Sequence, residues 1–138
     1  MLKPKELVAL AEQARERSYC PYSGFAVGAA LLCADGTVFT GCNIENAAFG
    51  PSVCAERTAV FKAISEGHRD FKALAVAGGT AGKPVEHECP PCGVCRQVLR
   101  EFCADDFPVY MSAGGGRYRR MRLSQLLPAS FRAEEQLG

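Results

Sequence analysis

The segment HECPPCGVCRQ, residues 87–97, places three of the chain's eight cysteines within seven positions. Cys89, Cys92 and Cys95 form two overlapping Cys-x-x-Cys pairs, a spacing that is typical of a metal site. The stretch that opens the chain intersperses charges among apolar residues and resembles neither a signal peptide nor a membrane span. We therefore expect a cytoplasmic protein in which thiols stay reduced, so that metal binding explains this cluster better than disulfides do.

Length and composition predict one domain. A chain of 138 residues with 48% hydrophobic and 22% charged content can bury a substantial core, and we expect a single domain over residues 1–138 with a flexible tail at about 132–138. The formal net charge of +1 gives no overall field that would attract nucleic acid or a membrane surface. Only RYRRMR, residues 117–122, is locally basic, so neither nucleic acid nor membrane is an expected partner.

Apolar periodicity and turn residues predict alternating helices and strands. Helices are expected at about 4–17, at about 53–66 with Ser52 as its cap, at about 92–102, and in a short segment before Pro128. Strands are expected as a hairpin over 25–44 that turns at 34–36, at 71–79, at 107–113, and as a possible edge strand within 114–123. This order predicts an α/β fold with helices on both faces of one mixed sheet.

Two of the predicted helices begin at cysteines. Cys54 lies at the start of the second helix and Cys92 at the start of the third, where the helix dipole stabilises a thiolate. Cys95 shares a helical face with Cys92, so both could bind one ion while Cys54 approaches from the neighbouring helix. Three protein ligands leave one position open, which is typical of catalytic rather than structural zinc.

Two further residues compete for a place at this metal. Cys89 also has a Cys-x-x-Cys relation to Cys92, but the two prolines that follow it favour an extended backbone, off the helical face. His87 could supply a fourth ligand and close a structural site, although it stands in a polar run typical of a solvated loop.

Glu56 and Arg57 follow Cys54 directly in the sequence SVCAERTAV. A glutamate at a helix start can simply complement the dipole, but beside a metal it can also carry protons between water and substrate. Three thiolates would give a zinc site a net negative charge, and the guanidinium of Arg57 could compensate it. Arg57 could instead be an ordinary solvated helix residue.

The combination of CAE at residues 54–56 with PCGVC at 91–95 resembles the zinc-deaminase signature. The segments YSGFAVGAALL, GCNIENAAFG, CAERTAVFKAISEG, PPCGVCRQVLREF and LLPASF extend this resemblance, over nearly the whole chain, to the small cytidine deaminases of pyrimidine salvage. The resemblance implies a three-layer α/β/α fold with a five-stranded mixed sheet, one zinc ion per chain, and a homotetramer in which neighbouring chains complete each active site. It also implies hydrolytic deamination of cytidine and 2′-deoxycytidine to the corresponding uridines, with release of ammonia.

The same resemblance assigns roles to individual residues. It makes Glu56 the residue that moves protons while an activated water attacks C4 of cytosine, and the charge of the three thiolates leaves Arg57 with the charge compensation given above. The implied zinc ligands are Cys54, Cys92 and Cys95, and the implied substrate contacts are Phe25, Asn43, Glu45, Phe49, Ala55 and Phe131.

Several of these residues also have simpler interpretations. The stretch NIEN could be an ordinary turn after a strand, and Phe25 a plain core residue. Phe131 could pack into its own core or be offered to a neighbouring chain. The sequence departs from the family pattern at Phe49, where tyrosine is frequent, and at Cys89, where the family often has a residue other than cysteine.

Three other functions are weighed against this one. Blasticidin S deaminase shares the zinc motif but lacks a stretch like NIEN, which favours a nucleoside. A nucleic-acid-editing deaminase would need a basic groove, and a structural zinc module would need a fourth protein ligand.

Overall fold

The computed structural model describes residues 1–137. The main elements in chain order are α1 (Pro4–Ala14), β1 (Phe25–Cys33), β2 (Val38–Cys42), α2 (Ala55–Ser65), β3 (Phe71–Thr80), α3 (Gly93–Phe102), β4 (Pro108–Gly114), β5 (Arg117–Arg122), α4 (Leu123–Leu126) and α5 (Ala133–Gln136), with a 3-10 turn at Arg15–Arg17 after α1. None of the helices within residues 1–137 has the length and apolar character that a membrane span requires.

The strands form one five-stranded sheet in the order β2-β1-β3-β4-β5. The β3–β4 pair is parallel and the other three pairs are antiparallel, which confirms the predicted mixed sheet. The β1–β2 hairpin turns at Gly36, whose φ of 93° favours glycine, and the side chain of Asp35 accepts a hydrogen bond from the backbone of Thr37.

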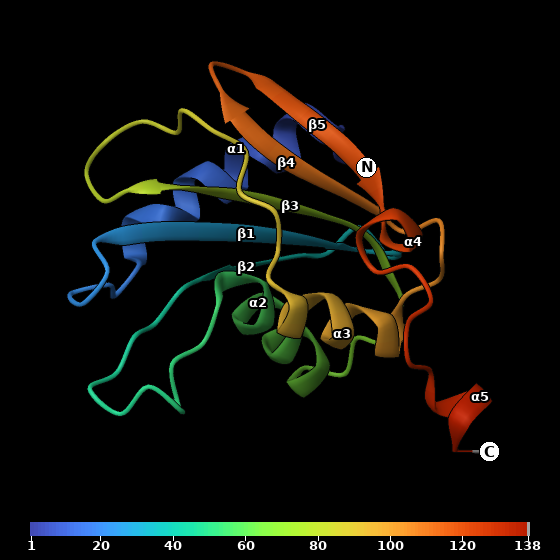
Figure 1. The fold of residues 1–138 in the computed structure, drawn as a ribbon. Helices are drawn as coiled ribbons and strands as arrows, with labels where there is room; N and C mark the ends of the chain where they lie inside the picture. The colour runs from blue at the N-terminus through green and yellow to red at the C-terminus, as the bar shows by residue number, and fades with distance from the viewer. Residues whose placement is uncertain (138) are drawn as a thin grey trace.

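Helices cover both faces of the sheet, as predicted (Figure 1). On one face, α1 packs through Leu7, Val8 and Ala11 against alternate residues of the central strands. On the other face, α2 and α3 lie side by side and enclose the larger core cluster, which includes Leu74 and Leu99. The fold is therefore a three-layer α/β/α sandwich, and both cysteine-bearing helices lie on the same side of the sheet.

Two glycines let helix backbones approach the sheet directly. A Cβ atom on Gly28 would lie 2.0 Å from the carbonyl oxygen of Ala11 in α1. A Cβ atom on Gly41 of β2 would lie 2.5 Å from the carbonyl oxygen of Ala55 and 2.6 Å from the backbone nitrogen of Ala59, both in α2. The missing side chain at Gly41 therefore sets how closely the first turn of α2 lies on β2.

The start of the second helix differs from the prediction. Cys54 and not Ser52 is the N-cap of α2, and the Ser52 hydroxyl instead accepts a hydrogen bond from the backbone of Asn46. The reason is non-local: Val53 exchanges two backbone hydrogen bonds with Ile44, which holds it in an extended conformation. The helix can begin only after this bridge.

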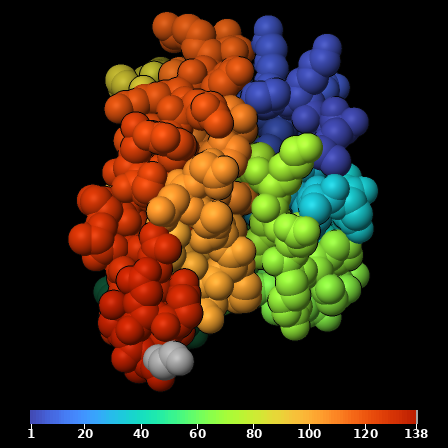
Figure 2. Space-filling view, turned by 90° about the vertical axis from the view of Figure 1, so that its right-hand side faces the viewer, coloured from blue at the N-terminus to red at the C-terminus, as the bar shows by residue number. Residues whose placement is uncertain are grey.

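The C-terminal segment lies against α3, as the red and lighter orange regions of Figure 2 show. The Arg96 side chain donates a hydrogen bond to the carbonyl of Leu126, and Gln97 donates one to the carbonyl of Phe131 at 3.0 Å. The short α4 ends just before Pro128, as predicted. Helix α5 lies within the stretch expected to form a tail.

Candidate metal centre and active site

Three thiols converge at the N-terminal ends of α2 and α3. Cys54 is the N-cap of α2, Cys92 is the N-cap of α3, and Cys95 lies in the first turn of α3. The Sγ atoms of Cys54 and Cys92 are 3.6 Å apart, and those of Cys92 and Cys95 are 3.5 Å apart. Sulfurs bound at ~2.3 Å to one tetrahedral zinc ion would be about 3.7 Å apart, so this arrangement fits zinc.

The thiol cluster offers a metal ion three protein ligands among the described residues. Cys54, Cys92 and Cys95 form the only cluster of three or more potential metal ligands found within residues 1–137, and neither Cys89 nor His87 belongs to it. All eight cysteines are free thiols. Three ligands leave a tetrahedral ion one open position, as catalytic zinc sites do.

The electrostatic environment favours thiolate at Cys54. A hydrogen bond from the Cys95 thiol lowers the pKa of Cys54 to about 5, and Arg57 acts in the same direction although partial burial opposes it. The pKa of Cys95 is raised by its contact with Cys54 and by burial. The Cys95 thiol and the Arg57 guanidinium thus stabilise the charged form of Cys54 that a metal ligand requires.

Glu56 lies beside the thiols in the first turn of α2. Its side chain is only 4% exposed, and its Oε1 has no hydrogen-bond partner among the described residues. Burial raises the pKa of Glu56 to about 7, and the nearby Cys54 thiolate adds to this effect. A carboxyl group with this pKa can both accept and return a proton near neutral pH.

These groups open into a cavity of about 410 Å³. Its walls come from β1 and the turn before it, from the segment between β2 and α2, from the start of α2 and from the segment before α3. They consist of Ser23, Phe25, Val27, Asn43, Glu45, Ser52, Val53, Cys54, Glu56, Arg57, Cys89, Pro90 and Cys92. The structure thus brings seven of the predicted site residues into one cavity, with the ligand Cys95 buried behind it.

Asn43 joins the end of β2 to β1. Its Oδ1 accepts a hydrogen bond from the backbone of Val27 and its Nδ2 donates one to the carbonyl of Phe25, both at 2.8 Å. The side chain is buried, and the amide retains one N–H that these two bonds do not use. Asn43 therefore fixes the part of β1 that carries Phe25.

Glu45 holds the turn that precedes β1. Its Oε1 accepts hydrogen bonds from the backbones of Tyr22 and Ser23, and its Oε2 accepts one from the Ser23 hydroxyl at 2.5 Å. The Ser23 hydrogen bond lowers the pKa of Glu45, so this carboxylate is ionised and oriented on the cavity wall.

Sequence reasoning left several cavity residues without a role. Ser23 and Val27 stand beside the motif residues in the sequence but belong to no signature, and Cys89 was considered as a competing ligand and as a departure from the family pattern. Burial raises the pKa of Cys89 to about 11, so its thiol is neutral at pH 7. The alternation of β1, which places Val27 on the same face as Phe25, could have identified Val27 as a wall residue.

Three predicted substrate contacts lie outside the walls of this cavity. Ala55 is the first residue of α2 and is fully buried in the core. Phe49 is exposed and lines an adjoining hollow with Tyr22 and Glu45. Phe131 is 52% exposed on the C-terminal segment. The roles of these three residues stay predictions.

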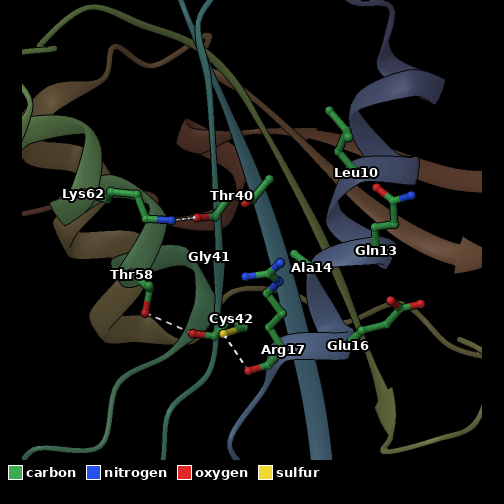
Figure 3. A pocket seen from close by; sticks show the side chains of 10 residues that line it. All are labelled: Leu10, Gln13, Ala14, Glu16, Arg17, Thr40, Gly41, Cys42, Thr58 and Lys62. Carbon is green, nitrogen blue, oxygen red and sulfur yellow. Dashed lines mark hydrogen bonds between the residues drawn. The ribbon is translucent and has the colours of Figure 1, made fainter.

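A second cavity, of about 370 Å³, lies between α1, β2 and α2 (Figure 3). Two of its polar side chains bind neighbouring backbone groups: Lys62 donates a hydrogen bond to the carbonyl of Thr40 and Thr58 donates one to the carbonyl of Cys42. None of the predicted site residues lines it. The thiol cluster and the polar residues of the first cavity make that one the candidate active site.

Comparison with known proteins agrees with this location. Residues 1–111 match the family model described as the cytidine and deoxycytidylate deaminase zinc-binding region. The cytidine deaminase of Sporosarcina psychrophila is 51% identical over 95% of this chain and 93% of its own length. That of Halalkalibacterium halodurans is 53% identical over 94% of both chains.

Structural comparison gives the same result. The crystal structure of cytidine deaminase from Burkholderia pseudomallei superposes with a TM-score of 0.85 at 43% sequence identity, covering 94% of this chain and 100% of that chain. The blasticidin-S deaminase of Bacillus cereus is similar to a lesser degree, with 26% identity over 76% of each chain. The zinc-binding region, the three-thiol cluster and the shared fold together show that this chain belongs to the cytidine deaminase family.

Proposed function

We propose that this protein hydrolyses cytidine and 2′-deoxycytidine to uridine and 2′-deoxyuridine, releasing ammonia, as an enzyme of pyrimidine salvage. The observation that carries the proposal is the position of Glu56, a buried carboxyl group with a pKa of about 7 at the edge of three metal-ligating thiols. A carboxyl group that served only the helix dipole would have no reason to lie in a cavity beside a metal site.

Cys54, Cys92 and Cys95 would hold the zinc ion. When bound, zinc would supply the positive charge that acidifies a water molecule at neutral pH. Arg57 would offset the charge of the three thiolates, because its Nη2 donates a hydrogen bond to Sγ of Cys54 at 3.4 Å.

Glu56 would carry the protons of the reaction. It takes one proton from the water that attacks C4 of the cytosine ring and passes it to N3. It then takes the second proton of that water, from the new hydroxyl on C4, and gives it to the amine as the C4–N bond breaks. Water adds oxygen at C4 and ammonia leaves, so the overall reaction needs no redox partner. Glu56 itself is buried, which keeps its carboxyl group away from bulk water during these transfers.

Phe25, Asn43 and Glu45 would hold the nucleoside. The ring of Phe25 would lie against the pyrimidine face, and the free N–H of Asn43 and the oriented carboxylate of Glu45 would bind the sugar hydroxyls. Two sugar-binding groups beside the metal site favour a nucleoside over the free base.

We further propose that the enzyme is a homotetramer that works in the cytoplasm. The exposed Phe49 and Phe131 lie outside the cavity of their own chain, which supports a site that a neighbouring chain completes. The free thiols support a cytoplasmic location, because the metal ligands must stay unoxidised and the cytoplasm is reducing. Contact by Phe49, Phe131 or the backbone of Ala55 with the nucleoside belongs to this proposal.

An ammonia-release assay tests the function. We expect turnover of cytidine and 2′-deoxycytidine, little turnover of cytosine, and none of blasticidin S or of single-stranded oligonucleotides containing cytosine. Efficient turnover of blasticidin S with none of cytidine would favour the related activity instead. A protein that holds zinc but releases no ammonia from any of these compounds would favour a structural zinc module.

A further inference from the structure

The backbone of Phe25 is fixed on both sides, but its ring is not. Its N–H donates a hydrogen bond to the Ser23 hydroxyl at 3.0 Å, and its carbonyl accepts one from Asn43 at 2.8 Å. Phe25 is the first residue of β1, and it is 43% exposed and lines the cavity. The position of the ring therefore depends on what packs beside it.

The sheet leaves a gap beside this ring. In the β1–β3 register Phe25 pairs with Thr80, so Gly78, two residues earlier in β3, is its diagonal neighbour on the same face. A Cβ atom on Gly78 would lie 3.0 Å from Cε2 of the Phe25 ring. Gly78 has no side chain that could support the ring laterally.

Cys89 fills this gap from the segment before α3. Its Sγ would lie 2.7 Å, and its Cβ 2.9 Å, from a Cβ atom placed on Gly78. The Cys89 side chain packs against the core cluster under α2 and α3 and also forms part of the cavity wall. The thiol and the Phe25 ring therefore share the space over one glycine.

We propose that Cys89 is a positioning residue, which acts through Phe25 and sets the plane in which the aromatic ring meets the pyrimidine. This inference rests on the proposed function for its substrate and on the packing above Gly78 for its mechanism. Without the sulfur atom the ring can relax toward Gly78 and away from the base, which weakens binding of the nucleoside. The chemical step stays intact, since Cys89 lies outside the three-thiol cluster.

Steady-state kinetics separates this role from that of a metal ligand. In Cys89→Ala we expect KM for cytidine to rise about fivefold, which is the size of effect that loss of an aromatic contact gives. The value of kcat should stay within about twofold of wild type, and the variant should still bind one zinc per chain. Cys89→Ser keeps an atom at the γ position, so its KM should lie close to the wild-type value. Loss of zinc in Cys89→Ala, or an unchanged KM, would overturn the proposal.

A double-mutant cycle tests whether Cys89 acts through Phe25. In a Phe25→Ala background, Cys89→Ala should have no further effect on KM, because the ring that it positions is already absent. An equal rise in KM in both backgrounds would show that Cys89 acts independently of the ring, against the proposal. Cys103→Ala removes a partly buried thiol elsewhere in the core and is the matched control, with KM expected to stay at the wild-type value.

Gly78→Ala probes the same contact from the other side. The added methyl would lie 2.7 Å from Sγ of Cys89 and 3.0 Å from the Phe25 ring, so the thiol or the ring must move. We expect a higher KM with zinc retained, and an unchanged KM would contradict the shared packing.

A crystal structure of Cys89→Ala gives a result that needs no turnover. We expect the Phe25 ring to shift toward Gly78 relative to wild type, and an unmoved ring would refute the positioning role. If wild type released no ammonia from cytidine, the proposed function would fail while this structural comparison would still decide the role of Cys89.

Discussion

The guanidinium of Arg57 donates a hydrogen bond to Sγ of Cys54 at 3.4 Å, across one turn at the start of α2. The contact places a fixed positive charge beside three thiols that become negative when they bind metal.

From this contact we predict a shifted pH profile for Arg57→Ala. Removing the guanidinium leaves the thiolate charge uncompensated, which makes the reactive water less acidic and also raises the pKa of the Glu56 base. The acidic limb of kcat/KM against pH should therefore move upward by about one pH unit. Arg57→Lys should recover part of this shift and Arg120→Ala, on the exposed strand β5, should show none. An unshifted limb in Arg57→Ala would exclude charge compensation.

The ligand set predicts which cysteines retain zinc. Replacing Cys54, Cys92 or Cys95 by serine should remove the metal or weaken its binding by at least ~10², because a hydroxyl is a poor replacement for a thiolate ligand. Cys89→Ser should keep one zinc per chain. Elemental analysis of the purified variants measures this directly, and the assignment fails if Cys89→Ser loses the metal while Cys95→Ser retains it.

Glu56→Gln should separate binding from chemistry. The amide keeps the size of the side chain but cannot take a proton, so turnover of cytidine should fall by at least ~10². Zinc content and nucleoside binding, measured by calorimetry, should stay close to wild type. Glu66→Gln changes an exposed glutamate at the end of the same helix and should remain fully active. Near-normal turnover in Glu56→Gln would show that another group moves the proton.

The buried thiol of Cys103 should lower the free energy of unfolding at alkaline pH. Burial raises the pKa of its thiol from 9.0 to about 12, so between these values the unfolded chain loses a proton that the folded chain keeps. Unfolding then releases a proton and the free energy of unfolding decreases as pH rises, by at most ~2 kcal/mol between pH 8 and pH 10.5. Below pH 8 both states are protonated and the effect vanishes.

Cys103→Ala isolates this contribution. Denaturant unfolding of wild type and variant at pH 8 and pH 10.5 should show a smaller alkaline loss in the variant. Equal losses would mean that the Cys103 thiol is not protected from ionisation.

Phe131 should matter for assembly. Gln97 holds the backbone of Phe131 while half of the side chain stays exposed, an arrangement that suits contact with a second copy of the chain. Phe131→Ala should therefore lower the mass measured by light scattering or raise KM for cytidine. Leu137→Ala removes an even more exposed apolar side chain, 76% exposed in the same segment, and serves as the control. A wild-type monomer with full activity would contradict the shared site.

Much of the metal centre could be predicted from the sequence because part of its geometry is local. Two of the three ligands, Cys92 and Cys95, fall on one helical turn, and turn-forming and proline residues place the starts of α2 and α3 approximately. The cap of α2 could not be predicted in the same way. Ser52 is a good capping residue, but the bridge between Ile44 and Val53 takes precedence, and this bridge joins segments that no local pattern pairs.

The wall of the cavity was harder to predict for the same physical reason. The proximity of Cys89 to Phe25 depends on the register between β1 and β3, and on the return of the chain from β3 to α3. The sequence indicates an unusual thiol in a proline-rich segment, but it does not indicate that Gly78 leaves room for it.

The contact of Gly41 with the first turn of α2 has a consequence for how this protein tolerates mutation. Any side chain at position 41 would meet the backbone of Ala55 or Ala59 rather than a flexible group that could yield. The strain would pass to the rigid helix and displace Cys54 relative to the two thiols on α3, and metal coordination tolerates errors of only ~0.2 Å in ligand distance. Position 41 is thus closed to substitution although it lines neither the metal site nor the active-site cavity. The mutational tolerance of the active site therefore depends partly on a strand residue that packs beneath α2.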